Sequence, residues 1–321
     1  MNEQTNQNDG VDRRGFLKCM AWVGTGVVWS MSGGGILTSS AFGAEPGGAT
    51  TEAAREAFSF VQISDSHIGF NKPVNADVTG TLKLTIDRIN AMKKRPEMIL
   101  HTGDLTHLSK PGEFDTVQQL LRGANAGETF YVPGEHDVFG DDGKLYRERF
   151  AIARGAANQN PWYSFDLKGV HFVGLVNVMN LQQNGLGKLG DDQLEWLEKD
   201  LADRTASTPV VVFAHVPLWS IYPQWGWGTL DSERALSYLK RFSAVTVLNG
   251  HIHQVLQKVE GNITFHTARS TAFPQPEPGK ADSPGPLKNV PAGMLKKMLG
   301  LTSVNYTENN GPLAIVDSTL E

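Results

Sequence analysis

The chain has 321 residues, of which 40% are hydrophobic and 20% are charged. This length and composition are sufficient for one large globular domain or two smaller ones. The formal net charge of −5 lacks the basic surplus that favours binding to a nucleic-acid backbone. We therefore expect no nucleic-acid partner.

Residues 1–43 have the order of an export signal. An arginine pair within Asp12–Lys18 precedes an apolar stretch, Cys19–Leu37, and small residues at Ala41–Ala44 that suit cleavage. The order is typical of a twin-arginine signal, which predicts the twin-arginine export machinery as a partner and a periplasmic or otherwise exported location. A membrane anchor is the alternative, but the glycines inside the apolar stretch disfavour it. No stable membrane span is expected after processing.

The remainder reads as a linker at residues 44–56, one main domain at 57–272, and a C-terminal part at 273–321. The C-terminal part combines a proline-rich excursion with a strand, Leu313–Val316, that is expected to pack on the same domain.

Within the main domain, strand-like runs alternate with segments whose apolar residues recur at helical spacing. These helical segments contain Leu82, Ile86 and Ile89; Phe114, Val117 and Leu121; Leu194, Leu197 and Leu201; and Leu236, Leu239 and Phe242. Two hairpins are predicted, at Trp162–Leu175 and at Gln254–Thr267 with a turn at Gly261–Asn262. The sheets should therefore be mixed rather than purely parallel.

Five short apolar runs are each followed by residues that can bind a metal ion. The runs are Phe60–Ile63, Met98–Leu100, Phe130–Val132, Val210–Phe213 and Val245–Leu248, and they precede Asp65-Ser66-His67, Gly103-Asp104, Gly134-Glu135-His136-Asp137, His215 and Gly250-His251-Ile252-His253. Carboxylates and imidazoles suit hard or borderline cations, and strands of an α/β sheet deliver side chains to one shared edge. The pattern predicts a metal site across strand ends.

The order Asp-x-His, Gly-Asp, Gly-x-His-Asp, His, Gly-His-x-His resembles the calcineurin-like metallophosphoesterases, over Phe58 to Ala272. The resemblance implies an α/β fold, a four-layer αββα sandwich in which two mixed β-sheets are flanked by helices, with two metal ions at one edge. The compact spacing is similar to that of the cyclic-nucleotide phosphodiesterase branch. It makes residues 57–272 a catalytic domain that acts on a small phosphate ester, and a phosphodiester is favoured over a monoester.

The resemblance also implies the ligands. It assigns Asp65, His67 and His253 to one ion, His215 and His251 to the other, and Asp104 to both. Two cations roughly 3.5 to 4 Å apart need an anion between them, which Asp104 and a hydroxide can supply. The hydroxide is the expected nucleophile, and His136, held by Asp137, is the expected acid for the leaving group.

Glu135 departs from the family pattern, in which Asn is usual at this position. With two divalent ions and one hydroxide, the carboxylates of Asp65, Asp104 and Glu135 make the centre neutral, whereas Asn would leave one positive charge. Three explanations are open: a trivalent ion such as Fe(III) restores the charge, Glu135 swings out of the site, or the site serves another task. We favour the first. The expected cofactors are two ions of Fe, Mn or Zn, with an iron-containing pair preferred.

Two other readings differ in class. In one of them, Glu135 has abolished catalysis, and the chain is a non-catalytic periplasmic metal-binding or interaction protein on the same fold. The presence of His136 and Asp137 argues against it, because a binding protein needs no acid for a leaving group. A metal-dependent redox protein is the third reading.

For several other residues the sequence allows a functional or a structural interpretation. Trp219, Tyr222, Trp225 and Trp227 can stack on a flat leaving group, or simply pack a long loop, which we favour. Ser270, Thr271 and Phe273 can face the substrate. His107 is either an exposed loop residue or a part of the site. His101, His171 and His266 are expected to be structural.

Overall fold

The computed structural model describes residues 57–151, 160–307 and 313–321, which belong to one compact unit, Ala53–Glu321. The predicted export signal and linker lie outside the described residues. The strands are β1 (Phe58–Ile63), β2 (Met98–His101), β3 (Glu128–Tyr131), β4 (Tyr163–Leu167), β5 (Val170–Gly174), β6 (Val210–Ala214), β7 (Val245–Asn249), β8 (Gln257–Glu260), β9 (Ile263–Thr267), β10 (Gly300–Tyr306) and β11 (Ala314–Thr319). The helices are α2 (Val78–Asn90), α3 (Pro111–Leu121), α4 (Lys144–Tyr146), α5 (Asp191–Ala202), α6 (Ser232–Leu239) and α7 (Leu295–Met298), with short turns η1 (Glu135–Asp137), η2 (Arg147–Ala151), η4 (Gln183–Gly185) and η5 (Pro223–Trp225).

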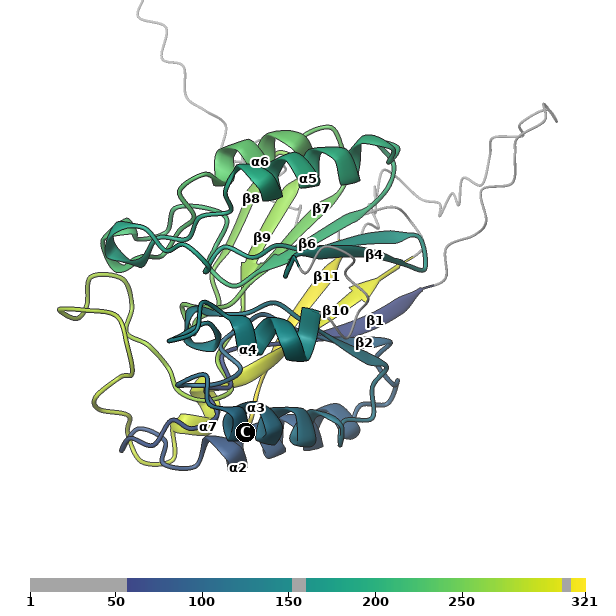
Figure 1. The fold of residues 1–321 in the computed structure, drawn as a ribbon. Helices are drawn as coiled ribbons and strands as arrows, with labels where there is room; N and C mark the ends of the chain where they lie inside the picture. The colour runs from purple at the N-terminus through teal and green to yellow at the C-terminus, as the bar shows by residue number, and fades with distance from the viewer. Residues whose placement is uncertain (1–56, 152–159, 308–312) are drawn as a thin grey trace, which may run out of the picture. The chain divides into compact units, whose positions relative to one another are not determined.

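The strands form two mixed sheets. One has the order β11-β10-β1-β2-β3, in which β1, β2 and β3 are parallel and β10 runs antiparallel to β1. The other has the order β4-β5-β6-β7-β9-β8, in which β5, β6, β7 and β9 are parallel and the edge strands are antiparallel. Helices α2 and α3 lie outside the first sheet, and α5 and α6 lie outside the second (Figure 1).

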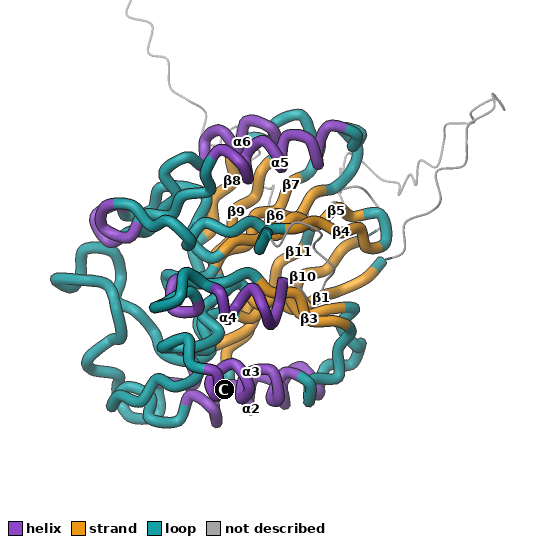
Figure 2. Tube along the Cα trace, viewed as in Figure 1, coloured by secondary structure: helices purple, strands orange, loops and turns teal. Residues whose placement is uncertain are grey.

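Alternating side chains place each strand between two layers of core, because successive residues of a strand point to opposite faces. In β1, Val61 and Ile63 pack toward α2 and α3, whereas Phe60 packs between the sheets. In β6, Val212 packs toward α5 and α6, whereas Phe213 packs between the sheets. The result is the four-layer αββα sandwich that the sequence predicted, with helices on both outer faces (Figure 2).

Most predicted elements are present. All four helical segments contain a helix, although α6 ends at Leu239, and Phe242 packs beyond its end. Both hairpins are confirmed: β4 pairs with β5, and β8 pairs with β9 around a turn in which Gly261 has φ +59°. Among the described residues, no helix combines the length and apolar character needed to cross a bilayer.

The C-terminal part differs from the prediction of a single short strand. Two strands are present, and β10 lies between β1 and β11 in the first sheet. Leu301 faces the α2–α3 side, while Val304 and Tyr306 face the opposite sheet. The polar residues Ser303 and Asn305 obscure this alternation in the sequence.

Candidate metal centre

The candidate ligands lie where the carboxyl ends of parallel strands from both sheets meet. Asp65 and His67 follow β1, Asp104 follows β2, Glu135 follows β3, His215 follows β6, and His251 and His253 follow β7. The sheets approach closely here, because His215 Nε2 lies 3.5 Å from Asp104 Oδ2. Seven side chains from five strands therefore converge at one edge, as the motif order predicted.

The backbone at these positions is unusual. Asp65, His67, Asp104, His251 and His253 all have positive φ, between +40° and +70°. Non-glycine residues rarely adopt this conformation, and it costs about 1–3 kcal/mol per residue. The surrounding structure enforces it, since the Asp65 N–H donates to the Gly103 carbonyl at 3.0 Å and the His67 N–H donates to the Asp104 carbonyl at 2.9 Å. Such concentration of strain is typical of functional sites.

The motif glycines are required by close approach. A Cβ added at Gly134 would lie 2.0 Å from Asp104 Oδ1, and one at Gly250 would lie 2.0 Å from the Ser64 hydroxyl. At Gly103, where φ is +98°, it would lie 2.5 Å from His215 Nδ1. Each glycine lets a ligand-bearing loop approach another, which explains its place beside the ligands in the sequence.

Asp65, His67 and His253 form the first group of candidate ligands. His67 Nε2 lies 3.3 Å from His253 Nε2, and His253 Nε2 lies 3.2 Å from Asp65 Oδ1. All three side chains are buried. The group coincides with the set that the sequence assigned to one ion.

Glu135, His215 and His251 form the second group. Glu135 Oε2 lies 2.9 Å from His215 Nε2, and Glu135 Oε1 lies 3.1 Å from His251 Nδ1. Glu135 therefore points into the site rather than away from it. This group is more open than the first: the side chain of Glu135 is 25% exposed and that of His251 12%.

Asp104 lies between the two groups. Its Oδ2 is 3.4 Å from His67 Nε2 in the first group and 3.5 Å from His215 Nε2 in the second. Its Oδ1 accepts a hydrogen bond from the His136 N–H at 2.9 Å. Oδ2 of Asp104 thus faces both ligand groups, while Oδ1 is held by a backbone N–H. A ligand that two ions share needs this arrangement.

The spacing of the side chains fits metal ions. Two ligands bound about 2.1 Å from one ion, at right or tetrahedral angles, lie about 3.0–3.4 Å apart. The nitrogen pairs His67–His253 and His215–His251 are each 3.3 Å apart. Imidazole and carboxylate are ligands that Fe, Mn and Zn accept. The donor set therefore suits two ions that share Asp104.

Backbone carbonyls orient two of the histidines. His215 Nδ1 donates to the Thr102 carbonyl at 2.7 Å, and His253 Nδ1 donates to the Phe273 carbonyl at 2.6 Å. A ring that carries its proton on Nδ1 keeps a lone pair on Nε2. In both rings, Nε2 is the atom that faces the other candidate ligands.

His136 lies beside both groups, but Asp137 does not hold it, so that part of the prediction was wrong. His136 Nδ1 donates instead to the His107 carbonyl at 2.8 Å. The Asp137 carboxylate accepts the backbone N–H groups of Leu105, Thr106 and Gly134 at 2.8–3.0 Å. Asp137 therefore joins the loop that carries Asp104 to the loop that carries His136, and acts on the site through these hydrogen bonds and through its charge.

The local charges favour the ionised carboxylates. Burial opposes ionisation of Asp65, but His253 and His215 lower its pKa to about 2. Burial likewise opposes ionisation of Glu135, yet His251 and His215 hold its pKa well below the usual range. Burial and the neighbouring histidines lower the pKa of His67 well below its usual value. These groups are thus in the deprotonated state that metal binding needs at neutral pH.

Three further groups of the centre have raised pKa values. Burial lowers the pKa of His215, but the carboxylates of Asp104 and Glu135 outweigh it and hold that pKa well above its usual value. Burial lowers the pKa of His136, but the carboxylates of Asp104 and Glu135 outweigh it and raise that pKa. Burial and the charge of Asp104 raise the pKa of Asp137 to about 7.

The aromatic loop residues mostly pack the fold. Trp227 is fully buried and Trp225 is 8% exposed, and both pack against Ile252 between the two histidines of the last motif. Trp219 packs on Phe265 of β9, with ring centroids 5.0 Å apart. A role in substrate stacking is therefore wrong for Trp225 and Trp227, because neither presents a ring face to solvent. Tyr222 is partly exposed and contacts Trp225.

Phe273 lies against the candidate metal ligands, which the sequence did not predict. Its ring lies 4.7 Å from the His67 ring and 4.6 Å from the His253 ring, and it is 3% exposed. The start of the proline-rich segment therefore packs against the first ligand group. The same segment contacts the second group, since Gln275 Nε2 donates to the His251 carbonyl at 3.0 Å. The hydroxyl of Ser270 is buried and donates to the Asp65 carbonyl at 2.8 Å, so Ser270 supports the site.

Comparisons with known proteins agree with this geometry. The family model described as calcineurin-like phosphoesterase matches residues 58–255. Glycerophosphodiester phosphodiesterase GpdQ of Enterobacter lignolyticus is 25% identical over 72% of this chain and 80% of its own length. A probable cyclic nucleotide phosphodiesterase of Rhodococcus erythropolis is 23% identical over 70% of this chain and 75% of its own length.

Two solved structures share the fold. A dimetal phosphatase from Danio rerio superposes with a TM-score of 0.59 at 15% identity, over 82% of this chain and 99% of its own. A purple acid phosphatase from yellow lupin gives a TM-score of 0.57 at 15% identity, over 83% of this chain and 52% of its own.

The fold and the two ligand groups define a metal-dependent phosphoesterase, a hydrolase. The family match extends over more than half of the chain, and the chain belongs to the calcineurin-like phosphoesterase family.

Proposed function

We propose that this enzyme is an exported phosphodiesterase with a binuclear, iron-containing centre and with His136 as the acid for the leaving group. The observation that carries the proposal is the placement of Asp104 between two complete ligand groups, with His136 directly beside them. The phosphodiesterase names of relatives near 25% identity support a diester substrate. Residues 57–272 supply every proposed ligand and the acid.

Two bound ions would supply Lewis acidity and the nucleophilic hydroxide. The chain orients the other reacting group. His136 Nδ1 donates to the His107 carbonyl, so the ring can release a proton only from Nε2. A ring nitrogen of His136 lies within 4.8 Å of carboxylate oxygens of Asp104 and Glu135, and therefore beside the proposed metal ligands. As the bond from phosphorus to the leaving oxygen breaks, that oxygen takes the Nε2 proton, and the neutral ring keeps its Nδ1 proton.

Glu135 supports iron in the second group. Both of its oxygens face nitrogens of that group, at 2.9 and 3.1 Å, which favours an ionised ligand over one that has swung away. A carboxylate in place of an amide adds one negative charge, which a trivalent ion balances. Of the three explanations for Glu135, we favour a hard trivalent ion, because it keeps Glu135 in the site and balances its charge.

The test combines metal analysis with activity on the same sample, purified without chelators. We expect close to two ions per chain, iron among them, and faster hydrolysis of bis-p-nitrophenyl phosphate than of p-nitrophenyl phosphate. His136→Ala should keep both ions and lose about 10²–10⁴-fold in kcat on a diester with a basic alkoxide leaving group, and less on bis-p-nitrophenyl phosphate, whose p-nitrophenolate needs little protonation. One ion or none, without turnover after manganese, iron or zinc is added, would favour a non-catalytic metal-binding protein.

Glu135→Asn tests the charge argument. Because it removes the balancing carboxylate, we expect it to lower iron content and to shift the metal preference toward divalent ions. If the variant keeps all of its iron and gains activity with manganese, the argument for a trivalent ion fails.

Export is tested separately. The Arg13→Lys, Arg14→Lys double variant should remain in the cytoplasmic fraction, whereas the native chain should be found outside it. Equal distribution of the two forms would remove export from the proposal.

A further inference from the structure

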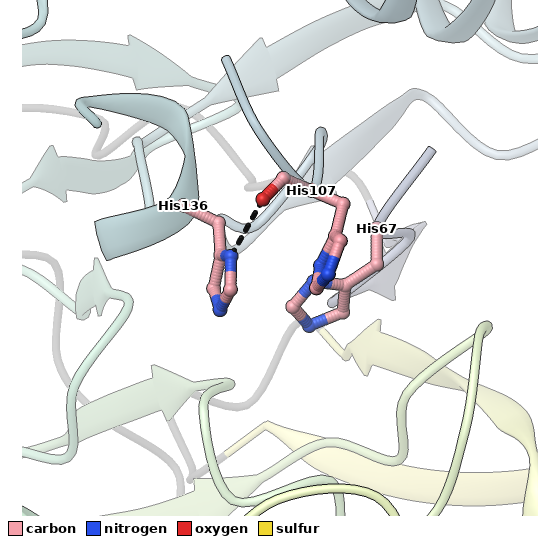
Figure 3. Close-up of side chains that lie close together, drawn as sticks. All are labelled: His67, His107 and His136. Carbon is pink, nitrogen blue, oxygen red and sulfur yellow. Dashed lines mark hydrogen bonds between the residues drawn. The ribbon is translucent and has the colours of Figure 1, made fainter. Parts of the chain in front are cut away.

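His67, His107 and His136 lie close together beside the metal centre, on loops that follow three different strands (Figure 3). The His107 and His136 rings are stacked, with centroids 4.8 Å apart and an interplanar angle of 17°. His107 Nδ1 lies 3.4 Å from His67 Nδ1. His107 thus contacts one proposed metal ligand through its side chain and the proposed acid through its ring and its carbonyl.

The backbone holds His107 in this position. The loop after β1 and the loop after β2 continue to pair beyond the sheet, through a parallel bridge between Ile68 and Thr106. The His107 N–H donates to the Ile68 carbonyl at 2.9 Å, and the Ile68 N–H donates to the Leu105 carbonyl at 3.0 Å. His67 and His107 therefore stand beside each other on paired backbone, which brings their side chains within reach of each other.

The direction of the hydrogen bond follows from the role of His67. Its Nε2 faces the rest of the first ligand group, 3.3 Å from His253 Nε2 and 3.4 Å from Asp104 Oδ2. A ligand nitrogen must carry a lone pair, so the His67 proton must be on Nδ1. Among the described residues, the partner of that Nδ1 is His107 Nδ1. His107 must accept this hydrogen bond, and its own proton must be on Nε2.

His107 therefore accepts a hydrogen bond from a ligand histidine through its side chain, whereas backbone carbonyls accept the corresponding hydrogen bonds from His215 and His253. The Thr102 carbonyl orients His215, and the Phe273 carbonyl orients His253. Partners of this kind set the tautomer and the ring orientation of a metal ligand, and their loss typically lowers metal affinity or activity about 10–100-fold. A carbonyl is present whatever the side chain, but the acceptor for His67 depends on the identity of residue 107.

We infer that His107 is a positioning residue: it sets the tautomer of His67 through Nδ1 and holds the plane of the His136 ring through stacking. The inference rests on the proposed function only in taking His67 as a metal ligand and His136 as the acid. The two effects come from different parts of one ring, so substitutions can separate them.

Two variants test the two effects. His107→Phe keeps an aromatic ring against His136 but removes the acceptor for His67. His107→Asn keeps an acceptor close to the position of Nδ1 but removes the ring. Leu108→Ala is the matched control, because Leu108 is the exposed neighbour in the same loop.

The first measurement is Mn²⁺ binding to metal-depleted protein by calorimetry, which requires no turnover. In His107→Phe, one of the two binding events should weaken about 10–100-fold while the other is unchanged. His107→Asn should recover most of that affinity, and Leu108→Ala should bind as the native protein does. In a His253→Ala background, which disables the first group, His107→Phe should have no further effect on the event that remains.

The second measurement is hydrolysis at saturating Mn²⁺ of diesters whose leaving groups differ in basicity. His107→Asn should lower kcat more for a basic leaving group than for p-nitrophenolate, because only the basic one needs the acid. Native-like Mn²⁺ affinity in His107→Phe, or equal affinities for the Phe and Asn variants, would overturn the inference. An inactive native enzyme that still shows the calorimetric pattern would refute the proposed function but leave the positioning of His67 intact.

Discussion

Among the residues that the structure describes, the metal centre and a second cluster of histidine and aspartate are built in different ways. In the metal centre, ring nitrogens face one another as well as carboxylates: His67 and His253 are 3.3 Å apart, as are His215 and His251. The other cluster surrounds His171, at the start of β5. There each ring nitrogen faces a carboxylate, Asp166 at 3.0 Å and Asp200 at 2.8 Å.

The polar groups of the His171 cluster find their hydrogen-bond and charge partners within the cluster. Arg204 pairs with Asp166 at 2.9 Å, and the Ser164 hydroxyl donates to Asp200 at 2.6 Å. None of these described residues has positive φ, in contrast to five ligands at the metal edge. A cluster of the same residue types thus stabilises the fold when donors match acceptors, and requires a cation when lone pairs face one another. The arrangement, rather than the composition, separates a structural cluster from a functional one.

The largest expected effect comes from removing the carboxylate that the two ligand groups share. Asp104→Asn should lower kcat/KM about 10³-fold, which corresponds to about 4 kcal/mol of transition-state stabilisation, because both ions lose a ligand. The unfolding free energy of the metal-free protein should change by less than about 1 kcal/mol, since Asn keeps the acceptor for the His136 N–H.

Activity is measured at saturating metal, and unfolding is followed by urea titration with chelator present. A large loss of stability in the metal-free variant would contradict the comparison, since it would mean that Asp104 stabilises the fold as the His171 cluster does.

Metal removal should have the next largest effect. Ions that bind only the folded state at 100 times their Kd stabilise it by about 2.7 kcal/mol per site. Each such site corresponds to about 5–10 °C in Tm for a domain of this size, so chelation of both ions should lower Tm by at least that amount. Differential scanning calorimetry with and without chelator measures the shift.

The matched control for metal removal is Asp200→Asn, which should reduce Tm by the same amount in both conditions. An unchanged Tm of the native protein after complete removal of its ions would show that the metal edge is already satisfied without them.

The fold and most of the site could be predicted because both have local signatures. Alternating residues such as Val212 and Phe213 reveal strands buried on both faces, and the motif glycines mark the positions where ligand loops approach closely. The shared edge of the strand ends predicts the metal site, and the resemblance to the family implies its division into two ligand groups. Local sequence patterns are therefore sufficient to predict most of the strands and helices and the edge at which the site lies.

What sequence reasoning missed depends on contacts across the chain. Asp137 is adjacent to His136 in sequence, yet its carboxylate accepts hydrogen bonds from backbone 32 residues away, at Leu105. Phe273 lies at the metal edge where the chain passes Asn75, whose side chain donates to the Ala272 carbonyl at 2.7 Å. Neither contact has a periodic or motif signal, because each is set by how two loops pack.

The smallest expected effect is at the structural cluster. Asp200→Asn should destabilise the metal-free protein by about 2 kcal/mol at pH 6, because it removes a charged hydrogen bond to the buried ring of His171. Asn at this position also lacks the negative charge that Arg204 and His171 face.

The pH dependence of the stability difference shows whether the charge of Asp200 causes it. Burial opposes ionisation of Asp200, but the hydrogen bonds from His171 and Ser164 outweigh it and lower the pKa of Asp200 below the usual 3.8. A carboxyl whose pKa is lower in the folded state stabilises the fold above its unfolded pKa, and this contribution is lost as pH falls through its folded pKa. The stability difference between the native protein and Asp200→Asn should therefore be complete at pH 6 and shrink below about pH 4. Urea titrations of both proteins with chelator present, at pH 6 and pH 3, measure it; a difference that persists at pH 3 would mean that packing, and not the charge of Asp200, accounts for the stability of this cluster.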